Sequence, residues 1–284
     1  MFRHYLITRF NLRNPKWDKT KNNESLLDEQ WMEHRMELFA NFCCPSVAAQ
    51  TQTNFTWLVC FDRTTAQKYR DRASELLSGI PQARILYLDG MPAFAPAVRQ
   101  LIESETKDIP YLITSRIDND DCIHRDFIGA IQSHFKRQDY RAIDIVKGYS
   151  LQVSPEFMLG KKEHIFNPFI SLIEKNDNPA TVWQSDHNMW KKESRITTVS
   201  NKRLWMSIIH EKNKVNEFDG YGDVSWEELQ RDFVVSDSMR NTIEQNLRPE
   251  KDWKWLSLKN AAYVKWVLFN KQFKRRLGIY KLKN

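Results

Sequence analysis

The chain has 284 residues, of which 41% are hydrophobic, 12% aromatic and 28% charged. Glycine and proline contribute only 8 and 10 residues, so the composition excludes collagen-like, low-complexity and intrinsically disordered classes. The excess of 43 Lys and Arg over 36 Asp and Glu gives a net charge of +7. This charge suits phosphate-bearing partners but does not choose among nucleotides, nucleic acid and anionic lipid.

Neither a membrane span nor a secretion signal is expected from the sequence. The best apolar stretch, residues 261–269, is too short to span a bilayer and contains Lys265. Arg9 interrupts the apolar start of the chain, where a signal peptide keeps its core free of charge. The 4 cysteines form no CxxC pair, which argues against a zinc site or a disulfide framework. We therefore expect a cytosolic protein.

Strand and helix patterns alternate through the first half of the chain. The predicted strands, rich in aromatic and β-branched residues, are residues 4–10, 55–61, 84–88 and 111–117. Apolar residues recur at helical spacing from Tyr69 to Leu77. Thr64 or Thr65 is the predicted N-cap of this helix, and Gly79 its C-terminal stop. A further helix is predicted from residue 127 and a late strand over 204–210.

This alternation predicts an α/β fold with a mostly parallel central sheet covered by helices on both faces. In such sheets, ligands bind at the carboxyl ends of the strands. Asp62, Asp89 and the acidic run 118–121 each follow a predicted strand. The sequence therefore places the functional site at this edge.

Asp118 and Asp120 are the first candidates for metal ligands. In extended geometry their side chains project to the same side, about 7 Å apart between Cα atoms, so both carboxylates can share one cation. Hard oxygen ligands favour Mg or Mn. The alternative is an acidic turn in which Asp121 or Asp126 caps the next helix.

His210, at the end of the predicted late strand, has two interpretations. A histidine there is either a structural residue of the sheet or a third metal ligand that meets Asp118 and Asp120 from a distant part of the chain. Sequence spacing alone does not decide between them.

Four segments in this order resemble the bacterial putative rhamnosyltransferase family, which is similar to glycosyltransferases of the GT-A fold. They are HYLITRFNLR (4–13), FCCPSVAAQTQTNFTWLVCFD (42–62), SRIDNDDCIHRDFI (115–128) and RLWMSIIHEKN (203–213). The resemblance implies a GT-A-like catalytic domain over residues 1–215. Residues 216–284 are then a helical extension with a basic amphipathic end, which the resemblance covers poorly.

The resemblance also implies a nucleotide-sugar donor, a divalent metal at Asp118-x-Asp120 and a location at the cytosolic face. Asp62 matches the acidic residue that holds the base and ribose in GT-A enzymes, and His210 matches a late histidine that completes their metal site. Thr8 and Arg9, at the end of the first strand, are placed to meet the nucleotide.

In the expected mechanism a nucleoside diphosphate leaves as the anomeric bond breaks. The metal, with Arg9 or Arg116 nearby, stabilises the growing negative charge. Asp186 is the first candidate for the base that activates the acceptor hydroxyl, His187 the second, and Asp121 a weaker alternative; a polar surface turn is the competing interpretation of Asp186 and His187. Inversion is inferred from the family's supposed rhamnose donor and not from any residue. The acceptor is expected to be a glycan or lipid-linked glycan of surface polysaccharide synthesis.

The last helix is predicted from Ser257 to just before Gly278, with an apolar side among basic residues. That side consists of Ala262, Trp266, Phe269, Phe273 and Leu277. We favour docking of this side on the catalytic domain, with the lysines and arginines in solvent. Peripheral contact with an anionic membrane is the alternative, and both can hold.

Two other functions remain alternatives. A metal-dependent phosphoester or nucleotide-sugar hydrolase would use the same aspartates, although an aspartyl-phosphate enzyme needs its DxD after an early strand. A basic module that binds nucleic acid or another polyanion is disfavoured, because no nucleic-acid motif organises the lysines and arginines.

Overall fold

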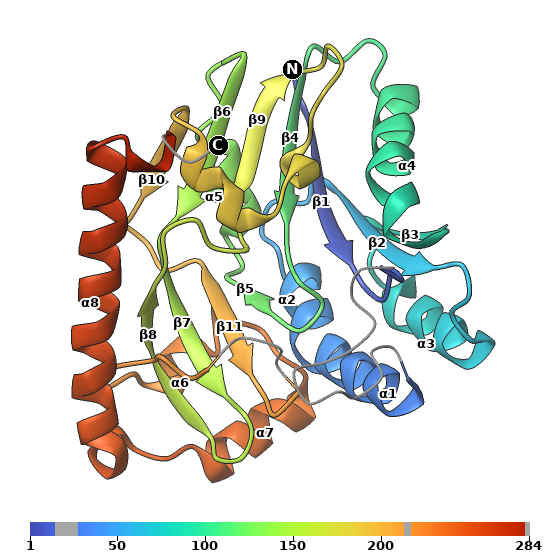
Figure 1. The fold of residues 1–284 in the computed structure, drawn as a ribbon. Helices are drawn as coiled ribbons and strands as arrows, with labels where there is room; N and C mark the ends of the chain where they lie inside the picture. Colours follow the sequence, from blue (N-terminus) through green and yellow to red (C-terminus); the bar gives the residue numbers. More distant parts are fainter. Residues whose placement is uncertain (15–27, 213–216, 282–284) are drawn as a thin grey trace.

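The computed structural model describes residues 1–14, 28–212 and 217–281 of the chain. The described strands form two sheets (Figure 1). The larger sheet contains, in spatial order, β10 (Ile196–Val199), β6 (Tyr140–Ile145), β9 (Ser171–Lys175), β4 (Tyr111–Arg116), β1 (Arg3–Arg9), β2 (Thr56–Asp62) and β3 (Ala83–Leu88). The smaller sheet contains β5 (Cys122–Ile123), β11 (Trp205–Ile209), β7 (Lys147–Gln152) and β8 (Met158–Glu163).

The strands at the centre of the larger sheet are parallel, as the alternating pattern predicts. β1 pairs with β2 on one side and with β4 on the other, and β2 pairs with β3, all in parallel. β9 runs antiparallel between β4 and β6, so the sheet is mixed. Arg9, Asp62 and Arg116 end β1, β2 and β4 and therefore lie at one edge of the sheet.

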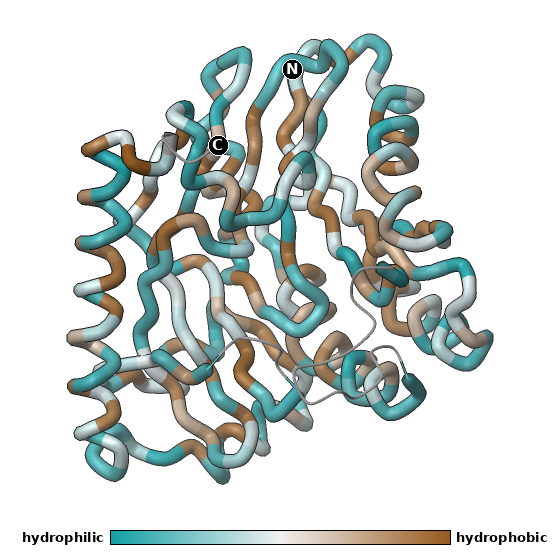
Figure 2. The backbone as a smooth tube through the Cα atoms, in the orientation of Figure 1, coloured by the Kyte–Doolittle hydropathy of each residue, from teal (hydrophilic) through white to brown (hydrophobic). Residues whose placement is uncertain are grey.

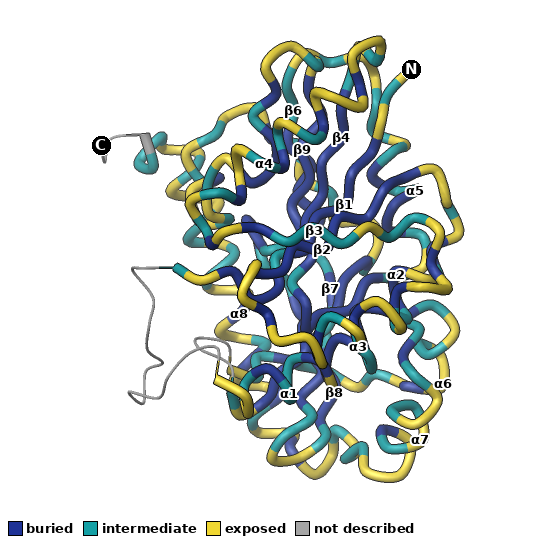
Figure 3. The backbone as a smooth tube through the Cα atoms, turned by 90° about the vertical axis from the view of Figure 1, so that its right-hand side faces the viewer, coloured by how far each residue is buried: buried dark blue, intermediate teal, exposed yellow. Residues whose placement is uncertain are grey.

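Helices cover both faces of the larger sheet, whose strands form a buried layer (Figure 3). One apolar core lies between the sheet and α1 (Glu29–Leu38), the π-helix η1 (Phe39–Cys43), α2 (Cys44–Ala48), α3 (Gln67–Ser78) and α5 (Phe127–Gln132). The opposite core lies beneath α4 (Gly90–Glu105) and the short helices η2 (Val182–Gln184) and η3 (His187–Lys192). Because successive residues of a strand point to opposite faces, Leu6 enters the first core and Ile7 the second.

The chain after residue 217 packs against the smaller sheet. A third core joins this sheet to α6 (Trp226–Leu229) and α7 (Asp237–Asn246). Backbone bridges link Lys161 to Tyr221 and Phe157 to Leu247. The predicted domain boundary between residues 215 and 216 lies outside the described residues.

The elements predicted for the first half of the chain are confirmed. Each of the first four strands agrees with its prediction to within one residue at either end, and Gly79 is the C-cap of α3. The predicted threonine cap is wrong, because Ala66 occupies the N-cap position of α3 without a side-chain bond. Thr64 and Thr65 instead donate their hydroxyl hydrogens to Asp62, and so satisfy acceptor oxygens at the end of β2.

The predicted aspartate cap of α5 is also absent. Asp126 occupies the N-cap position but makes no capping bond, and its carboxylate accepts a hydrogen bond from the Thr51 hydroxyl. The Asp121 carboxylate accepts from the backbone N–H of Ile208. Each carboxylate therefore serves a contact distant in sequence.

The last helix, α8 (Lys254–Arg276), has the predicted extent, and η4 (Glu250–Trp253) and η5 (Ile279–Lys281) flank it. The prediction that its aromatic side docks on the catalytic domain is wrong, because Trp266, Phe269 and Phe273 are exposed. Docking uses the opposite, largely polar side. The Ser257 hydroxyl accepts from the backbone N–H of Gly222, at 2.8 Å, and Asn260 donates to backbone carbonyls of residues 218 and 220.

α8 lies along one side of the molecule (Figure 1), where it also contacts the edges of both sheets, at β10 and next to β8. Arg275 donates to the carbonyl of Ile196 and the hydroxyl of Thr198 in β10, and Lys271 donates to the carbonyl of Ile165, just after β8. These cations cover backbone groups that an open edge leaves unpaired. Polar partners therefore decide which side of α8 faces inward. Within the described residues no helix is long and apolar enough to cross a bilayer.

His4 makes the folded protein sensitive to acid. Burial lowers the pKa of His4 to about 3. The ring Nδ1 lies 3.3 Å from the amide nitrogen of Gln132, and Nε2 lies 2.9 Å from the hydroxyl of Ser115. Below pH 6.5 His4 binds a proton in the unfolded chain but stays neutral in the folded chain. The free energy of unfolding therefore falls as the pH falls below this value. Between pH 6.5 and 4.5 we expect a loss of about 2 to 3 kcal/mol in the free energy of unfolding.

Urea denaturation at a series of pH values measures this loss. The variant His4→Gln removes the titrating group and is expected to show a shallower fall over the same range. Equal slopes for wild type and variant would contradict the assignment to His4.

Candidate functional site

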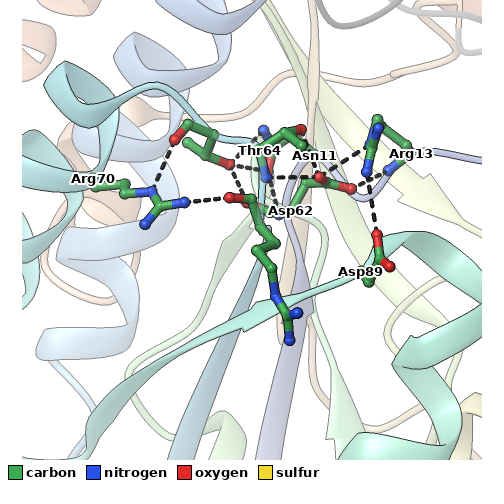
Figure 4. A network of polar contacts seen from close by, with 8 residues as sticks. Asn11, Arg13, Asp62, Thr64, Arg70 and Asp89 are labelled. Carbon is green, nitrogen blue, oxygen red and sulfur yellow. Dashed lines mark hydrogen bonds and ion pairs between the residues drawn. The ribbon is translucent and has the colours of Figure 1, made fainter.

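Asp62, at the end of β2, is the centre of a polar network (Figure 4). Its buried carboxylate accepts from the backbone N–H and Nε of Arg13, at 3.0 and 3.1 Å, and from the backbone N–H and hydroxyl of Thr64, at 2.9 and 2.7 Å. Burial opposes ionisation, but these four donors outweigh it and lower the pKa of Asp62. Asp62 is therefore an ionised anchor for the loop that follows β1.

The same loop is fixed from two other sides. Asn11 accepts from the backbone N–H of Asp62, at 3.0 Å, and donates to the Thr65 hydroxyl, at 3.0 Å. The carbonyl of Arg13 accepts from the backbone N–H of Met91 at the start of α4, at 2.8 Å. Gly90 permits this approach, since a Cβ there would lie 2.9 Å from that carbonyl and its φ is +69°.

A cavity of about 330 Å³ lies beside Asp62. It is lined by Asn11, Arg13, Asp62, Thr64, Thr65, Ala66, Lys68 and Tyr69, together with Asp28, Glu29 and Met32. The cavity offers hydroxyls, a tyrosine ring and both signs of charge, which is a lining suited to a base and a sugar. The predicted donor residue Asp62 thus lies in a cavity wall.

The Asp62 network supports a prediction about stability. In Asp62→Asn an amide NH₂ replaces one acceptor oxygen and faces donors of Arg13 and Thr64, so at least one partly buried donor loses its partner. We expect the free energy of unfolding to fall by about 2 kcal/mol. Chemical denaturation measures this fall, and Asp71→Asn on the exposed side of α3 is the matched control. A fall no larger than that of the control would contradict the anchoring role.

Arg9 and Arg116 meet over one tryptophan ring. The Cζ of Arg116 lies 3.7 Å from the ring centroid of Trp183, and the Cζ of Arg9 lies 4.8 Å from it. The ring is held at 5.2 Å from Phe94 of α4 in an edge contact. Trp183 thus aligns the predicted donor residues of β1 and β4 side by side.

Arg116 is a buried guanidinium with spare donors. It is 2% exposed, and its Nε and Nη1 have no hydrogen-bond partner among the described residues. Its Nη2 lies 3.7 Å from the carboxylate of Asp118. Burial lowers the pKa of Arg116, Arg9 lowers it further, and Asp118 and Asp186 oppose this shift. An arginine kept dry with donors to spare is suited to bind an anion.

The predicted acceptor-side residues lie near this arginine pair. Asp186 precedes η3 and is exposed, and its charge acts on both Arg116 and His187. Burial lowers the pKa of His187, and Arg116 adds to this shift while Asp118 and Asp186 oppose it. The structure therefore gathers Arg9, Arg116, Asp118, Asp186 and His187, which come from three distant segments.

Asp120 and His210 do meet, as the functional interpretation of His210 requires. The carboxylate of Asp120 lies 3.1 Å from Nε2 of His210 and also forms an ion pair with Arg35 of α1. Nδ1 of His210 lies 3.1 Å from Nε2 of His34. Burial opposes ionisation of Asp120, but Arg35 and His210 hold its pKa below the usual range.

Asp121 lies in the protein beside Asp120. Its burial raises its pKa, and the charges of Asp120 and Asp118 raise it further. A buried carboxyl that already accepts the backbone N–H of Ile208 is poorly placed to meet an acceptor hydroxyl, which argues against Asp121 as the base.

The arrangement of the acidic run also tests the predicted metal site. Asp118 faces Arg116, whereas Asp120 faces Arg35 and His210. Within residues 1–14, 28–212 and 217–281, no three His, Cys, Asp or Glu side chains are arranged to hold a metal ion. Asp120 and His210 are in contact while Asp118 pairs with Arg116, and a metal ion at these three residues stays a prediction.

Thr8, the last of the predicted donor-binding residues, has a packing role. The structure also adds residues to the site that the sequence did not predict. Thr8 is fully buried, and its hydroxyl accepts from the indole N–H of Trp57, at 2.9 Å. Arg13, His34 and Arg35 join the site although no motif marked them. Trp183 is buried, and its ring also contacts the arginine pair.

Comparison with known proteins identifies the family. The family described as putative rhamnosyl transferase matches residues 3–220 of the chain. The chain belongs to this family. The predicted α/β fold, with a mostly parallel mixed sheet flanked by helices, is confirmed. No curated protein matches the chain.

Solved structures resemble the chain more distantly. TarS 1–349 of S. aureus in complex with UDP is 12% identical with a TM-score of 0.41, over 73% of this chain and 60% of that protein. A putative glucose-1-phosphate thymidylyltransferase of Bacillus anthracis is 11% identical with a TM-score of 0.34, over 72% of this chain and 89% of that one. The inositol-1-phosphate CTP transferase of T. maritima is 9% identical with a TM-score of 0.34, over 76% and 92%. These values are low, and the assignment depends on the family match.

Proposed function

We propose that this protein is a glycosyltransferase that moves a sugar, rhamnose in keeping with the family description, from a nucleotide-sugar donor to a glycan acceptor. The observation that carries the proposal is the arginine pair over Trp183, with spare guanidinium donors on buried Arg116. Two guanidinium groups over one ring supply positive charge and planar donors of the kind that bind a diphosphate. A nucleotide sugar carries that group next to the bond that breaks.

The donor would extend from the cavity beside Asp62 to the arginine pair. The two parts are adjacent, because Arg13 of the cavity wall bonds to Met91 through its carbonyl and Arg9 contacts the sulfur of Met91, at 3.6 Å. In this orientation the nucleoside occupies the cavity, and the diphosphate lies beneath Arg9 and Arg116. TarS, solved with UDP, is a distant structural relative and agrees with this class of donor.

Arg9 and Arg116 act on the leaving group. As the anomeric carbon–oxygen bond breaks, its electron pair stays with the diphosphate, and negative charge grows on the oxygen nearest the sugar. Guanidinium groups already positioned in a dry site stabilise this charge without reorganisation. Trp183 fixes their positions.

Asp186 is the proposed base. As an exposed carboxylate beside Arg116, it can take the proton of an acceptor hydroxyl while that oxygen attacks the anomeric carbon from the face opposite the diphosphate. Attack from that face would invert the configuration at the anomeric carbon. His187 is the second candidate, because burial keeps its ring neutral and able to accept a proton.

A divalent cation at Asp118, Asp120 and His210 stays a prediction from the sequence, and no step above depends on it. When bound at a diphosphate, such an ion supplies a Lewis acid. Mn²⁺ titration of donor turnover, with and without a chelator, tests the prediction. Activity unchanged by chelation would leave charge stabilisation to the arginines.

Nucleotide binding and sugar transfer test the proposed function together. Thermal-shift measurements against a panel of nucleoside diphosphates, with and without Mn²⁺, are expected to identify one base that raises the melting temperature. The matching nucleotide sugars are then incubated with and without glycan acceptors. Release of sugar to water alone, even with acceptors, would favour the hydrolase, and a salt-sensitive shift with RNA but none with nucleotides would favour a polyanion-binding module.

A further inference from the structure

The solvent-facing side of α8 is an apolar stripe. Trp255 is 86% exposed, Trp266 63%, Phe269 67% and Phe273 49%. At about 100° per residue these side chains fall within one narrow sector, which Leu258 and Leu277 extend. The side opposite this sector is the one that docks through Ser257 and Asn260. α8 is thus amphipathic with its apolar side outward, and Figure 2 shows hydrophobic and hydrophilic residues alternating along it.

Adjacent rings stabilise this stripe on the helix itself. Phe269 and Phe273 stack with their centroids 6.0 Å apart, and Tyr263 and Trp266 stack at 6.5 Å. Isolated exposed aromatics need no explanation, but a continuous row of them on one helix marks an interaction surface.

The charge on α8 indicates what the stripe contacts. The helix has no acidic residue. Lys254, Lys259, Lys265, Lys274 and Arg276 are exposed on it, while Lys271 and Arg275 face the body of the protein. The exposed cations flank the apolar stripe, so the outward surface is apolar along its middle and positive beside it.

A second copy of the chain is a poor occupant for this surface. Pairing two copies of α8 would bring lysines together with no carboxylate on either helix to neutralise them. A bilayer with anionic lipids has complementary chemistry, because acyl chains receive the apolar side chains and headgroups receive the cations. Tryptophan and tyrosine rings also prefer the boundary between headgroups and acyl chains.

We propose that the outward side of α8 binds the surface of a membrane that contains anionic lipids, with the helix axis parallel to the bilayer plane. The helix is already folded and fixed by its polar side, so binding needs no ordering of this segment. The proposal is independent of the proposed function.

The inner side of α8 connects this surface to the site. Lys271 acts electrostatically on His187, and Tyr280 of η5 lies 5.8 Å from the ammonium of Lys191 in η3, the helix that contains His187. If the transferase function holds, membrane binding through α8 would bring the site close to lipid-linked glycans.

Vesicle co-sedimentation of the full chain tests the proposal. Vesicles of phosphatidylcholine are compared with vesicles containing about 30 mol % phosphatidylglycerol, and binding to the anionic vesicles is expected to be at least about tenfold stronger and to weaken as salt rises. The variant Trp266→Ser/Phe269→Ser, altered only at exposed positions, is expected to keep its melting temperature and to lose about tenfold or more in binding.

Charge variants separate the electrostatic part. Lys259→Gln/Lys265→Gln is expected to lose about fivefold per lysine on anionic vesicles, whereas Lys107→Gln/Lys136→Gln, exposed lysines outside α8, is the matched control and is expected to bind as wild type. Equal binding to both kinds of vesicle, or unchanged binding of the α8 variants, would overturn the proposal. A dimer that the Trp266→Ser/Phe269→Ser variant abolishes, without vesicle binding by wild type, would assign the stripe to a second copy instead.

Discussion

Replacement of Arg116 by Met is expected to lower kcat/KM for sugar transfer by about 10²- to 10³-fold. The Met side chain keeps the apolar contact with Trp183 but removes the spare donors and the charge that the diphosphate would meet. Because the charge on the leaving group is greatest in the transition state, most of the loss should appear in kcat. Steady-state kinetics with the donor identified by the nucleotide screen measures the effect.

Two further variants separate anion binding from packing. Arg116→Lys retains the charge but loses the planar fork, and it is expected to recover only part of the activity. Arg195→Met is the matched control, because Arg195 also stacks on an aromatic ring, that of Tyr140 at 3.9 Å, but lies outside the site. Full activity in Arg116→Met, with an unchanged melting temperature, would contradict the proposed role of Arg116 in binding the diphosphate.

Asp186→Asn is expected to reduce kcat by about 10²- to 10⁴-fold, because the amide cannot accept the proton of the acceptor hydroxyl. The KM for the donor should change little, since the proposed base faces the acceptor. Asp186→Glu is expected to recover part of the activity. These values come from initial rates at saturating donor and acceptor.

Asp177→Asn, an exposed aspartate in the loop that precedes η2, is the matched control. If Asp186→Asn instead retains wild-type kcat, His187 becomes the leading candidate, and His187→Gln should then show the large loss. Loss of donor binding by Asp186→Asn would show that the residue serves the donor and not the acceptor.

The sequence was sufficient for the central sheet because those strands are buried on both faces. β2 is buried along its whole length, so it reads as a continuous apolar run that periodicity detects. The strands between residues 140 and 199 were not predicted, because contacts with distant parts of the chain determine where they form. β8 contains Gly160, where a Cβ would lie 2.3 Å from the backbone nitrogen of Tyr221, and no local pattern reports that approach.

The site was predictable in part for a similar reason. Residues that end strands, such as Arg9, Asp62 and Arg116, follow from strand position alone. Arg35 was not predictable, because its contact with Asp120 requires α1 to lie against the end of β4, which no spacing within the chain encodes. The prediction of which side of α8 faces inward was wrong because it considered hydropathy without the polar partners that decide this orientation.

The shared ring of Trp183 has a consequence for the catalytic cycle. Burial lowers the pKa of Arg116 and the charge of Arg9 lowers it further, and a bound dianion would offset both effects. This offset is larger for the spent nucleoside diphosphate than for the intact donor, because breaking the anomeric bond leaves an additional negative charge on the diphosphate. Departure of the product should therefore limit the rate of turnover at saturating substrate, and sulfate or pyrophosphate in the buffer should act as a competitive inhibitor toward the donor.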